Sequence, residues 1–396
     1  MTRSGNKPVA VWLFVCCALI YAMVMLGGFT RLTHSGLSMV NWEPIMGVVP
    51  PVTKSDWQKV FGRYKRFPEY KDVNRGMSLR AFKRIFYVEY THRMLGRFIG
   101  LAFLVPLIVF VLMGRITRAM IPRFAAMFLL GGAQGLLGWF MVRSGLVNRP
   151  SVSQYRLAAH LVLAVFIYGF IFWSALSLWR GTGRRSGAYS SLHRFGWGAV
   201  VVVIIMIASG GFVAGTHAGF VFNTFPKMGN TWIPAGIWAM SPGWRNLFAN
   251  VETIQLSHRA LALVVALTVT TLGLFSLRLP RGDGARLTAV LMLAALVIQL
   301  SLGISTLLLR VPVALGVSHQ GGALALFTLV LIHTHFLKYA NAQYPGGYSA
   351  RIDSRTQGGD TPSFPVRGSR YNPYDEQTSC AAAAVSPGGN RGPVAL

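Results

Sequence analysis

Long runs of apolar residues recur along the chain and alternate with short basic segments. Most runs approach the roughly 20 residues that a helix needs to cross a bilayer. Unbroken apolarity favours helices over membrane-spanning strands, in which apolar and polar residues alternate. The pattern therefore predicts an all-α integral membrane protein with eight transmembrane helices, at residues 9–29, 87–113, 121–142, 156–179, 196–215, 253–277, 287–309 and 318–338.

Composition and charge refine this prediction. The chain is 53% hydrophobic and 12% charged, whereas a soluble domain carries about 25% charged residues. The net charge of +27 lies in loops between predicted spans, so we exclude a nucleic-acid partner. Three short basic loops, within 114–123, 180–194 and 278–286, place themselves and both termini on the inner side. The outer loop 30–86 is also basic, but long loops obey the charge rule less well.

Neither the termini nor the cysteines indicate a functional site. Residues 1–8 form a short inner-side N-terminus with no cleavable signal expected. Residues 341–396 are rich in Gly, Pro, Ser and Arg and poor in large apolar residues, so we expect a disordered tail. Cys16 and Cys17 lie inside the first predicted span and Cys380 lies in the tail, which provides no disulfide framework.

The chain repeats itself. The segments GGFTRLTHSG (27–36), EYTHR (89–93) and QGLLG (134–138) return as GGFVAGTHAG (210–219), QLSHR (255–259) and QLSLG (299–303). Each half contains an even number of predicted helices, which keeps both halves in the same orientation. The expected fold is therefore two parallel-repeat four-helix bundles, at residues 9–179 and 180–340.

Four histidines occupy matching positions in these halves. His92, His160, His258 and His319 fall in the first turn or two of spans two, four, six and eight, which all run from the outer side inward. Two imidazoles that face each other across a bundle are what six-coordinate heme iron requires. A structural zinc site would need about four ligands, and no thiolate is available here. A packing role is the ordinary explanation for one histidine, but two matched pairs favour axial heme ligands.

The other five histidines are not assigned to iron. His34 and His217 lie in outer loops, and His193 lies in an inner basic loop. His333 and His335 lie about 21 Å or more from His319 along the same helix, too far to ligate the same iron.

Arg93 and Arg259 each follow a predicted ligand. Because guanidinium groups bind carboxylates in bidentate geometry, these arginines are possible contacts of heme propionates. The alternative is that they extend to the membrane interface. Span three also carries Gly131, Gly132, Gly135 and Gly138, for which we prefer ordinary helix packing over close approach of a flat macrocycle.

One position breaks the symmetry of the halves. Glu89 precedes His92 by three residues and shares its helix face, whereas Gln255 holds the matching position before His258. A buried carboxylate has a raised pKa and can act as acid or base. We therefore predict that Glu89 is catalytic and that the second half holds a fixed redox heme. The alternative is that Glu89 only orients a ligand or pairs with Arg93.

At these residues the chain resembles the heme A synthase family, on the branch shared by mitochondria and many proteobacteria. The resemblance covers about 9–338. It rests on GGFTRLTHSGLSMVNWEPIMGVVPP, FPEY, FKRIFYVEYTHRMLGR and AAH in the first half, and on VAGTHAGFVFNTFPKMG, QLSHR and SHQ in the second. Another branch of the family carries a cysteine pair in the first outer loop. Loop 30–86 contains no cysteine here, so no disulfide of that kind is expected.

The resemblance implies an oxidoreductase that converts heme O to heme A, by oxidising a ring methyl to a formyl group, for cytochrome oxidase of the aa3 type. It implies that His92 and His160 hold heme O and heme A, that His258 and His319 hold heme b, and that Glu89 matches a glutamate important for the reaction. Electrons would arrive through heme b while Glu89 assists proton removal from the methyl. Heme O synthase and cytochrome oxidase assembly factors are the partners it suggests.

Location and alternative functions remain open at the level of sequence. The chain fits the mitochondrial inner membrane, which we favour, or a bacterial plasma membrane, with the heme ligands near the intermembrane-space or periplasmic side. A diheme b-type electron-transfer cytochrome would also use paired histidines, but it leaves the difference between Glu89 and Gln255 unexplained. A non-enzymatic heme carrier or assembly factor would bind one exchangeable heme without changing it. No electron donor is identified.

Overall fold

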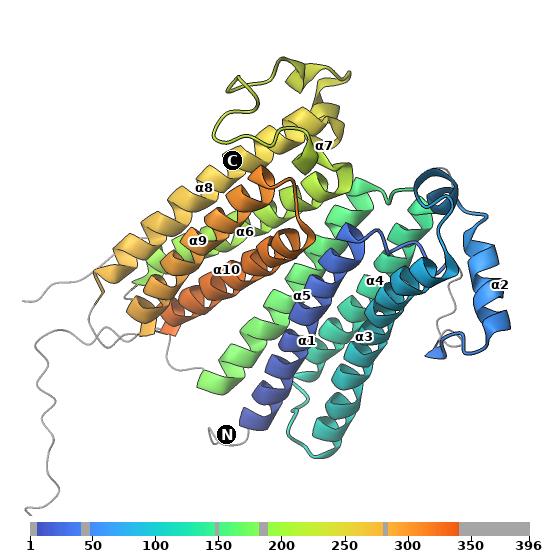
Figure 1. Cartoon of the computed structure of the whole chain (residues 1–396). Helices are drawn as coiled ribbons and strands as arrows, with labels where there is room; N and C mark the ends of the chain where they lie inside the picture. Colours follow the sequence, from blue (N-terminus) through green and yellow to red (C-terminus); the bar gives the residue numbers. More distant parts are fainter. Residues whose placement is uncertain (1–5, 41–47, 147–149, 182–188, 280–283, 340–396) are drawn as a thin grey trace, which may run out of the picture. The chain divides into compact units, whose positions relative to one another are not determined.

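The computed structural model describes the chain except residues 1–5, 41–47, 147–149, 182–188, 280–283 and 340–396. The described part is helical, and its only β-structure is an isolated bridge between Met228 and Thr231. Its eight long helices (Figure 1) are α1 (Lys7–Leu32), α3 (Leu79–Leu112), α4 (Ile121–Gly145), α5 (Gln154–Arg180), α6 (Ser190–Thr216), α8 (Val251–Leu277), α9 (Gly284–Leu308) and α10 (Val313–Tyr339). The predicted tail, 341–396, lies outside the described residues.

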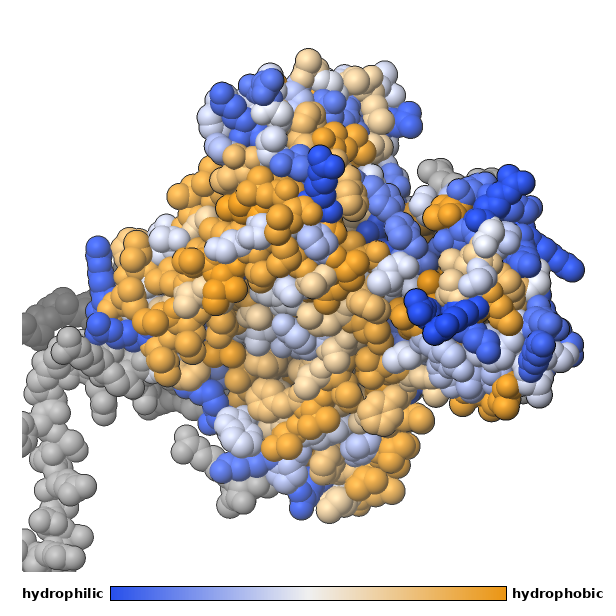
Figure 2. Space-filling model, viewed as in Figure 1, coloured by the Kyte–Doolittle hydropathy of each residue, from blue (hydrophilic) through white to orange (hydrophobic). Residues whose placement is uncertain are grey.

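All eight helices are long and apolar enough to cross a bilayer. Each predicted span coincides with one of them, usually with two or three further residues of helix at an end. Figure 2 shows hydrophobic surface over much of one face, with hydrophilic residues gathered toward its edges. The prediction of an all-α, multi-pass membrane protein is therefore confirmed.

Contacts between helices form two sets of four. In the first set α1 and α4 each pack against both α3 and α5; in the second, α6 and α9 each pack against both α8 and α10. The sets meet where α1 contacts α10 and where α5 contacts α6 and α10. At the first of these junctions Tyr21 donates to the carbonyl of Gly321 at 2.9 Å, and Gln320 donates to that of Val24 at 2.7 Å. This grouping agrees with two four-helix halves, while the parallel repeat itself stays a prediction.

The helix α3 begins at Leu79, eight residues before the predicted start at residue 87. The side chain of Ser78 caps it by accepting a hydrogen bond from the N–H of Ala81 at 3.2 Å. The added turns carry Phe82 and Phe86, which are buried in a small second core. Packing in this core explains the earlier start of α3. It stabilises helical turns outside the apolar run, which the hydropathy of the sequence does not predict.

The partners of these two phenylalanines come from the outer loop. They are Trp57, Phe61 and Tyr64 of helix α2 (Lys54–Tyr64). A capping box between Thr53 and Asp56 starts α2, and the short π-helix η2 (Glu69–Val73) follows it. The loop of the second half is built differently, from η4 (Ala218–Phe220), η5 (Ala235–Trp238), η6 (Gly243–Arg245) and α7 (Asn246–Ala249).

Candidate functional site

The first histidine pair belongs to α3 and α5. His160 lies in the second turn of α5, as predicted, whereas His92 lies in the fourth turn of α3 because that helix starts earlier. The two are close enough for His92 to act electrostatically on His160. Each ring lies against a glycine of another helix: a Cβ added at Gly27 of α1 would be 3.4 Å from His92 Nε2, and one added at Gly138 of α4 would be 2.9 Å from His160 Cε1.

The second pair repeats this arrangement on α8 and α10. His258 and His319 both lie in the second turn of their helices and within electrostatic range of each other. A Cβ added at Gly210 of α6 would be 3.5 Å from His258 Cε1, and one added at Gly303 of α9 would be 2.8 Å from His319 Cε1. Gly27 matches Gly210, and Gly138 matches Gly303, in the repeated sequence motifs.

Two matched glutamines support one histidine of each pair. Gln134 of α4 donates to the carbonyl of His160 at 3.0 Å, and its Nε2 is 3.5 Å from His160 Nε2. Gln299 of α9 donates to the carbonyl of His319 at 3.0 Å, and its Nε2 is 3.1 Å from His319 Nδ1. The sequence analysis did not assign them, although both lie in the repeated motif of α4 and α9. They hold the histidine-bearing turns of α5 and α10 against the neighbouring helix.

These surroundings fit a heme in each half. Each half provides two imidazoles on helices of one bundle. The glycine beside each imidazole leaves room for that ring. Polar atoms also remain buried without a hydrogen-bond partner at both sites, namely Nδ1 of His160 and Oε1 of Gln134 and Gln299. Buried polar groups normally have a partner, so unsatisfied groups beside both pairs agree with sites that bind a ligand.

The carboxylate of Glu89 is held by the outer loop and by Arg93. Its Oε2 accepts hydrogen bonds from Ser38 Oγ at 2.7 Å and from the N–H of Met39 at 2.8 Å. Its Oε1 accepts from Arg93 at 2.6 Å, and the Glu89 side chain is only 3% exposed. The pairing with Arg93, stated above as the alternative, is therefore present. The catalytic role of Glu89 stays a prediction.

Both arginines that the sequence suggests as possible propionate contacts donate to loop carbonyls. Arg93 donates to the carbonyl of Met39 at 2.8 Å as well as to Glu89. Arg259 donates to the carbonyls of Phe222 at 3.2 Å, Thr224 at 2.9 Å, Pro226 at 3.1 Å and Lys227 at 3.2 Å. In this structure the two arginines tie the loops to α3 and α8.

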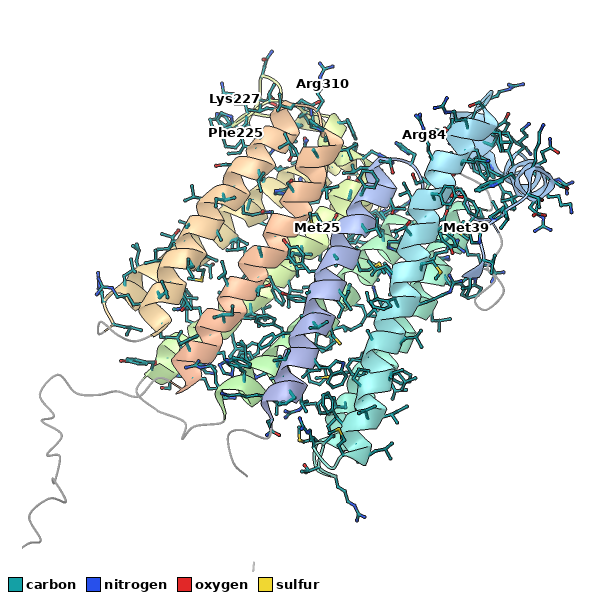
Figure 3. All side chains as sticks on the ribbon, turned by 60° about the horizontal axis from the view of Figure 1, so that its bottom comes forward. Met25, Met39, Arg84, Phe225, Lys227 and Arg310 are labelled. Atoms are coloured by element: carbon teal, nitrogen blue, oxygen red, sulfur yellow. The ribbon has the colours of Figure 1, made fainter. Side chains whose placement is uncertain are left out.

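In both halves the arginine after the histidine, and the side chain three residues before the histidine, hydrogen-bond to the backbone of the loop. We call this arrangement the loop clamp. Phe222 is the repeat equivalent of Met39, and Gln255, the equivalent of Glu89, donates to the Phe222 carbonyl at 3.1 Å. The side chain at this position of the clamp is therefore an acid in the first half and an amide in the second. In Figure 3 Met39 lies beside α3, and Phe225 and Lys227 lie with Arg310 at one end of the second-half helices.

A second buried acid lies in the outer loop, in a place that the sequence analysis did not single out. Glu69 is 4% exposed, and Tyr64 donates to its Oε2 at 3.4 Å while Asn74 donates to the Tyr64 hydroxyl at 2.7 Å. Burial raises the pKa of Glu69 to about 8, and the nearby charge of Glu89 adds to the shift. Glu69 is therefore largely protonated at neutral pH.

The remaining histidines are away from the paired sites. His333 lies between the hydroxyls of Ser276 and Thr288, at 2.9 Å from each. His335 contacts Ser177 and Arg180, and His193 contacts the carbonyl of Thr334. His333 and His335 are buried and hydrogen-bonded, while His193 is half-buried and lies in the first turn of α6 and not in the loop where the sequence placed it.

His34 and His217, which the sequence places in separate outer loops, stack on each other. Their ring centroids are 6.3 Å apart and the rings are 9° from parallel. Burial lowers the pKa of His217, and the charges of Arg31 and His34 add to the effect. The pair links the C-terminal ends of α1 and α6.

The glycines of α4 differ from the expectation of close helix packing. A Cβ added at Gly131, Gly132 or Gly135 would meet no atom of the described chain within 4 Å. Only Gly138 is in close contact, and its neighbour is the ring of His160. Helix–helix packing therefore does not explain these glycines.

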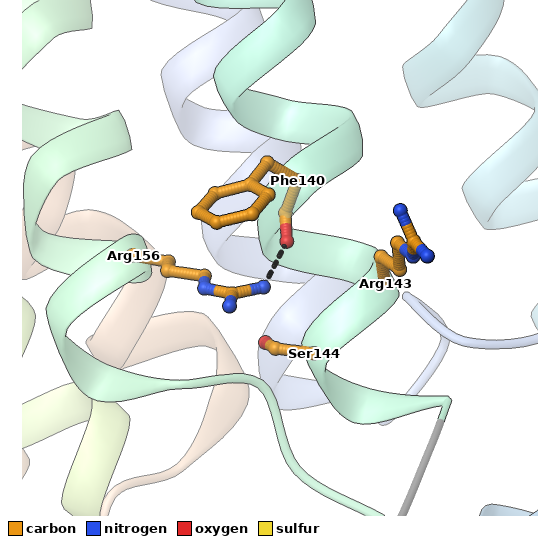
Figure 4. A pocket seen from close by; sticks show the side chains of 4 residues that line it. All are labelled: Phe140, Arg143, Ser144 and Arg156. Carbon is orange, nitrogen blue, oxygen red and sulfur yellow. Dashed lines mark hydrogen bonds between the residues drawn. The ribbon is translucent and has the colours of Figure 1, made fainter.

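A pocket of about 310 Å³ lies at one end of α4 and α5 and is lined by Phe140, Arg143, Ser144 and Arg156 (Figure 4). Arg156 donates to the carbonyl of Phe140 at 2.7 Å, and its guanidinium lies 3.6 Å from the centroid of that ring. The pocket contains none of the four paired histidines.

Comparison with known proteins identifies the family of the chain. Residues 10–331 match the COX15-CtaA family, described as cytochrome oxidase assembly protein. The heme A synthase of Nitrosospira multiformis is 49% identical over 336 residues, which cover 84% of this chain and 94% of that protein. Heme A synthase COX15 is 43% identical in Bos taurus, over 83% of this chain and 82% of the relative, and 43% identical in Arabidopsis thaliana, over 85% and 76%. The chain therefore belongs to the COX15-CtaA family, the heme A synthase family that its motifs resemble.

Proposed function

We propose that the protein is a heme A synthase, an oxidoreductase that converts heme O to heme A by oxidising a ring methyl to a formyl group. The observation that carries this proposal is the pair of matched histidine sites, each with its glycines, in a chain 43–49% identical to proteins of that name. Multi-pass membrane character suits substrates as apolar as these hemes.

The two sites take different roles in this proposal. His92 and His160 would hold heme O and then heme A, while His258 and His319 would hold a heme b. A heme b supplies one-electron redox chemistry when bound. The assignment rests on the resemblance and on a polar difference between the halves, where Glu89 stands in place of the amide of Gln255.

Glu89 is the proposed group that moves protons at the first site. Its carboxylate lies one helical turn from His92 and is oriented by Ser38, Met39 and Arg93. An acid fixed in this way can accept a proton without first reorganising its surroundings. Arg93 and Arg259 support the sites by holding the loops, and contact with propionates remains a proposal for both.

The location and partners belong to the same proposal. Heme O synthase and cytochrome oxidase assembly factors are the proposed partners, and the proposed site lies near the outer side of a mitochondrial inner membrane or bacterial plasma membrane. Close relatives from bacteria, cattle and plants support either membrane.

Extraction and chromatography of the bound pigments test the function. Purified protein, expressed with a source of heme O, is expected to contain heme B together with heme A or hydroxylated heme O. Heme B alone, in two equal portions, would favour a diheme b-type cytochrome. One exchangeable and unmodified heme would favour a carrier, and either result would reject the synthase.

A further inference from the structure

His258 has a hydrogen-bond partner on its ring that its counterpart lacks. Ser209 Oγ lies 2.7 Å from His258 Nδ1 and donates to the carbonyl of Met206 at 2.9 Å. The single hydroxyl proton is thus used within α6, which leaves an oxygen lone pair facing the imidazole. With the hydroxyl proton on the Met206 carbonyl, the tautomer that fits has Nδ1–H donating to Ser209 and Nε2 presenting its lone pair.

The first half has no such arrangement. The repeat places Leu26, immediately before Gly27, where Ser209 precedes Gly210. Both glycines lie against the ring of their histidine: an added Cβ would be 3.4 Å from His92 Nε2 at Gly27 and 3.5 Å from His258 Cε1 at Gly210. No side-chain hydrogen bond to His92 occurs among the residues that the structure describes. A leucine side chain provides no acceptor, so the ring of His92 receives no hydrogen bond from Leu26.

This difference is confined to one ligand of each pair. His160 and His319 both have a glutamine from the preceding helix, Gln134 and Gln299. The glutamine-to-carbonyl bonds therefore match at α4–α5 and α9–α10, although the glutamine faces Nε2 of His160 and Nδ1 of His319. The serine hydroxyl at α6–α8 has no counterpart at α1–α3. A ring N–H donated to a second group orients a metal-bound histidine, fixes its tautomer and makes it a stronger ligand.

We propose that Ser209 makes His258 a permanently held heme ligand, and that Leu26 leaves His92 weakly held so that one heme can enter and leave. The inference deepens the proposed function, on which it rests, by assigning retention to the second half and exchange to the first. Ser209 and Leu26 act through the histidines and are positioning residues.

Ser209→Ala and Ser209→Thr test retention. The alanine variant should lose its second-half heme about tenfold faster to excess apomyoglobin in detergent. Its low-spin b-type signal should also titrate at a higher midpoint potential, because a less basic imidazole favours the ferric state less. Threonine keeps the hydroxyl and can make the same bond to the carbonyl three residues back, so it should restore both values. Unchanged potential and heme loss in the alanine variant would overturn the proposal.

Leu26→Ser tests exchange, with Leu26→Ala as its control for lost apolar volume. Serine should slow the loss of heme O or heme A from the first half about tenfold, and alanine should not. Equal rates in the two variants would overturn the proposal, even if Ser209→Ala fails to accumulate.

If the pigments are heme B alone, the proposed function fails, yet the potential of Ser209→Ala still tests the effect of Ser209 on His258. If heme A is present and both tests are negative, only the further inference fails.

Discussion

The carboxylate of Glu89 accepts a hydrogen bond from the backbone N–H of Met39 at 2.8 Å, and this contact joins a transmembrane helix to the outer loop. Arg93 completes the clamp by donating to Glu89 and to the carbonyl of the same Met39. The residue expected to do chemistry is thus also part of the fold, so its structural and chemical roles must be separated by experiment.

Arg93→Ala should destabilise the protein by about 3 kcal/mol, at the low end for breaking a buried ion pair, because Arg93 is itself 18% exposed. The variant leaves the Glu89 charge buried without its partner. Thermal unfolding in detergent measures the loss, and limited proteolysis should show faster cleavage in loop 30–78. Arg84→Ala, at an exposed position on the same helix, is the matched control. Equal stability of the two variants would contradict the clamp.

Glu89→Gln separates the two roles. The amide oxygen can still accept from Ser38 and Met39, and the second half already uses Gln255 at this position. We expect the fold and heme content to persist while the ratio of heme A to heme O falls about 10²-fold or more, the contribution of one acid–base group. Chromatography of extracted hemes gives the ratio. A wild-type ratio in both Glu89→Gln and Glu89→Ala would exclude Glu89 from the chemistry.

Gly138→Ala and Gly303→Ala should each disturb one heme site. The new Cβ would lie 2.9 or 2.8 Å from the ring of His160 or His319, and overpacking of this kind costs about 1–3 kcal/mol. The first variant should lose heme O and heme A, and the second should lose heme B. Gly100→Ala and Gly198→Ala are the controls, because their added Cβ atoms meet nothing within 4 Å. Heme loss that is equal in all four variants would show that the glycines act only through helix stability.

His258→Ala should abolish the low-spin b-type absorbance, since six-coordinate heme needs both axial imidazoles. His333→Ala, which removes a buried histidine of α10 that contacts Ser276 and Thr288, is the control and should keep the absorbance. A reduced-minus-oxidised spectrum measures the change. If His258→Ala has the spectrum of the wild type, the ligand assignment is wrong.

Glu69 should make the outer loop sensitive to pH. Its folded-state pKa of about 8 lies above the ordinary glutamate pKa of 4.5, so folding favours the protonated form. The stability that it contributes is complete below about 4.5, decreases as pH rises, and is lost once pH passes about 8. Proteolysis of the loop should therefore accelerate from pH 5 to about 8 and then level off. Glu69→Gln, which mimics the neutral acid, should show a weaker pH dependence. The same pH dependence in both proteins would refute this role.

The sequence predicted the helices and the histidine pairs because both depend on local pattern. An apolar run long enough to span a bilayer has few alternatives to a helix, and a repeated motif marks equivalent positions regardless of how the chain packs. The sequence missed the early start of α3, since Phe82 and Phe86 are buried by loop residues some 20 positions away. It also misread the glycines of α4, whose neighbours only the fold reveals.

The sequence by itself determined that this is an eight-span membrane protein with two matched pairs of histidines and one acid without a counterpart. Only the tertiary structure decided what Arg93 and Arg259 bind, which groups Glu89 contacts, and which histidine has a hydrogen bond to Ser209. The physical reason is the length of these side chains. A long side chain near a helix end can meet several loops or a ligand, and the choice depends on backbone carbonyls brought there from more than 30 residues away.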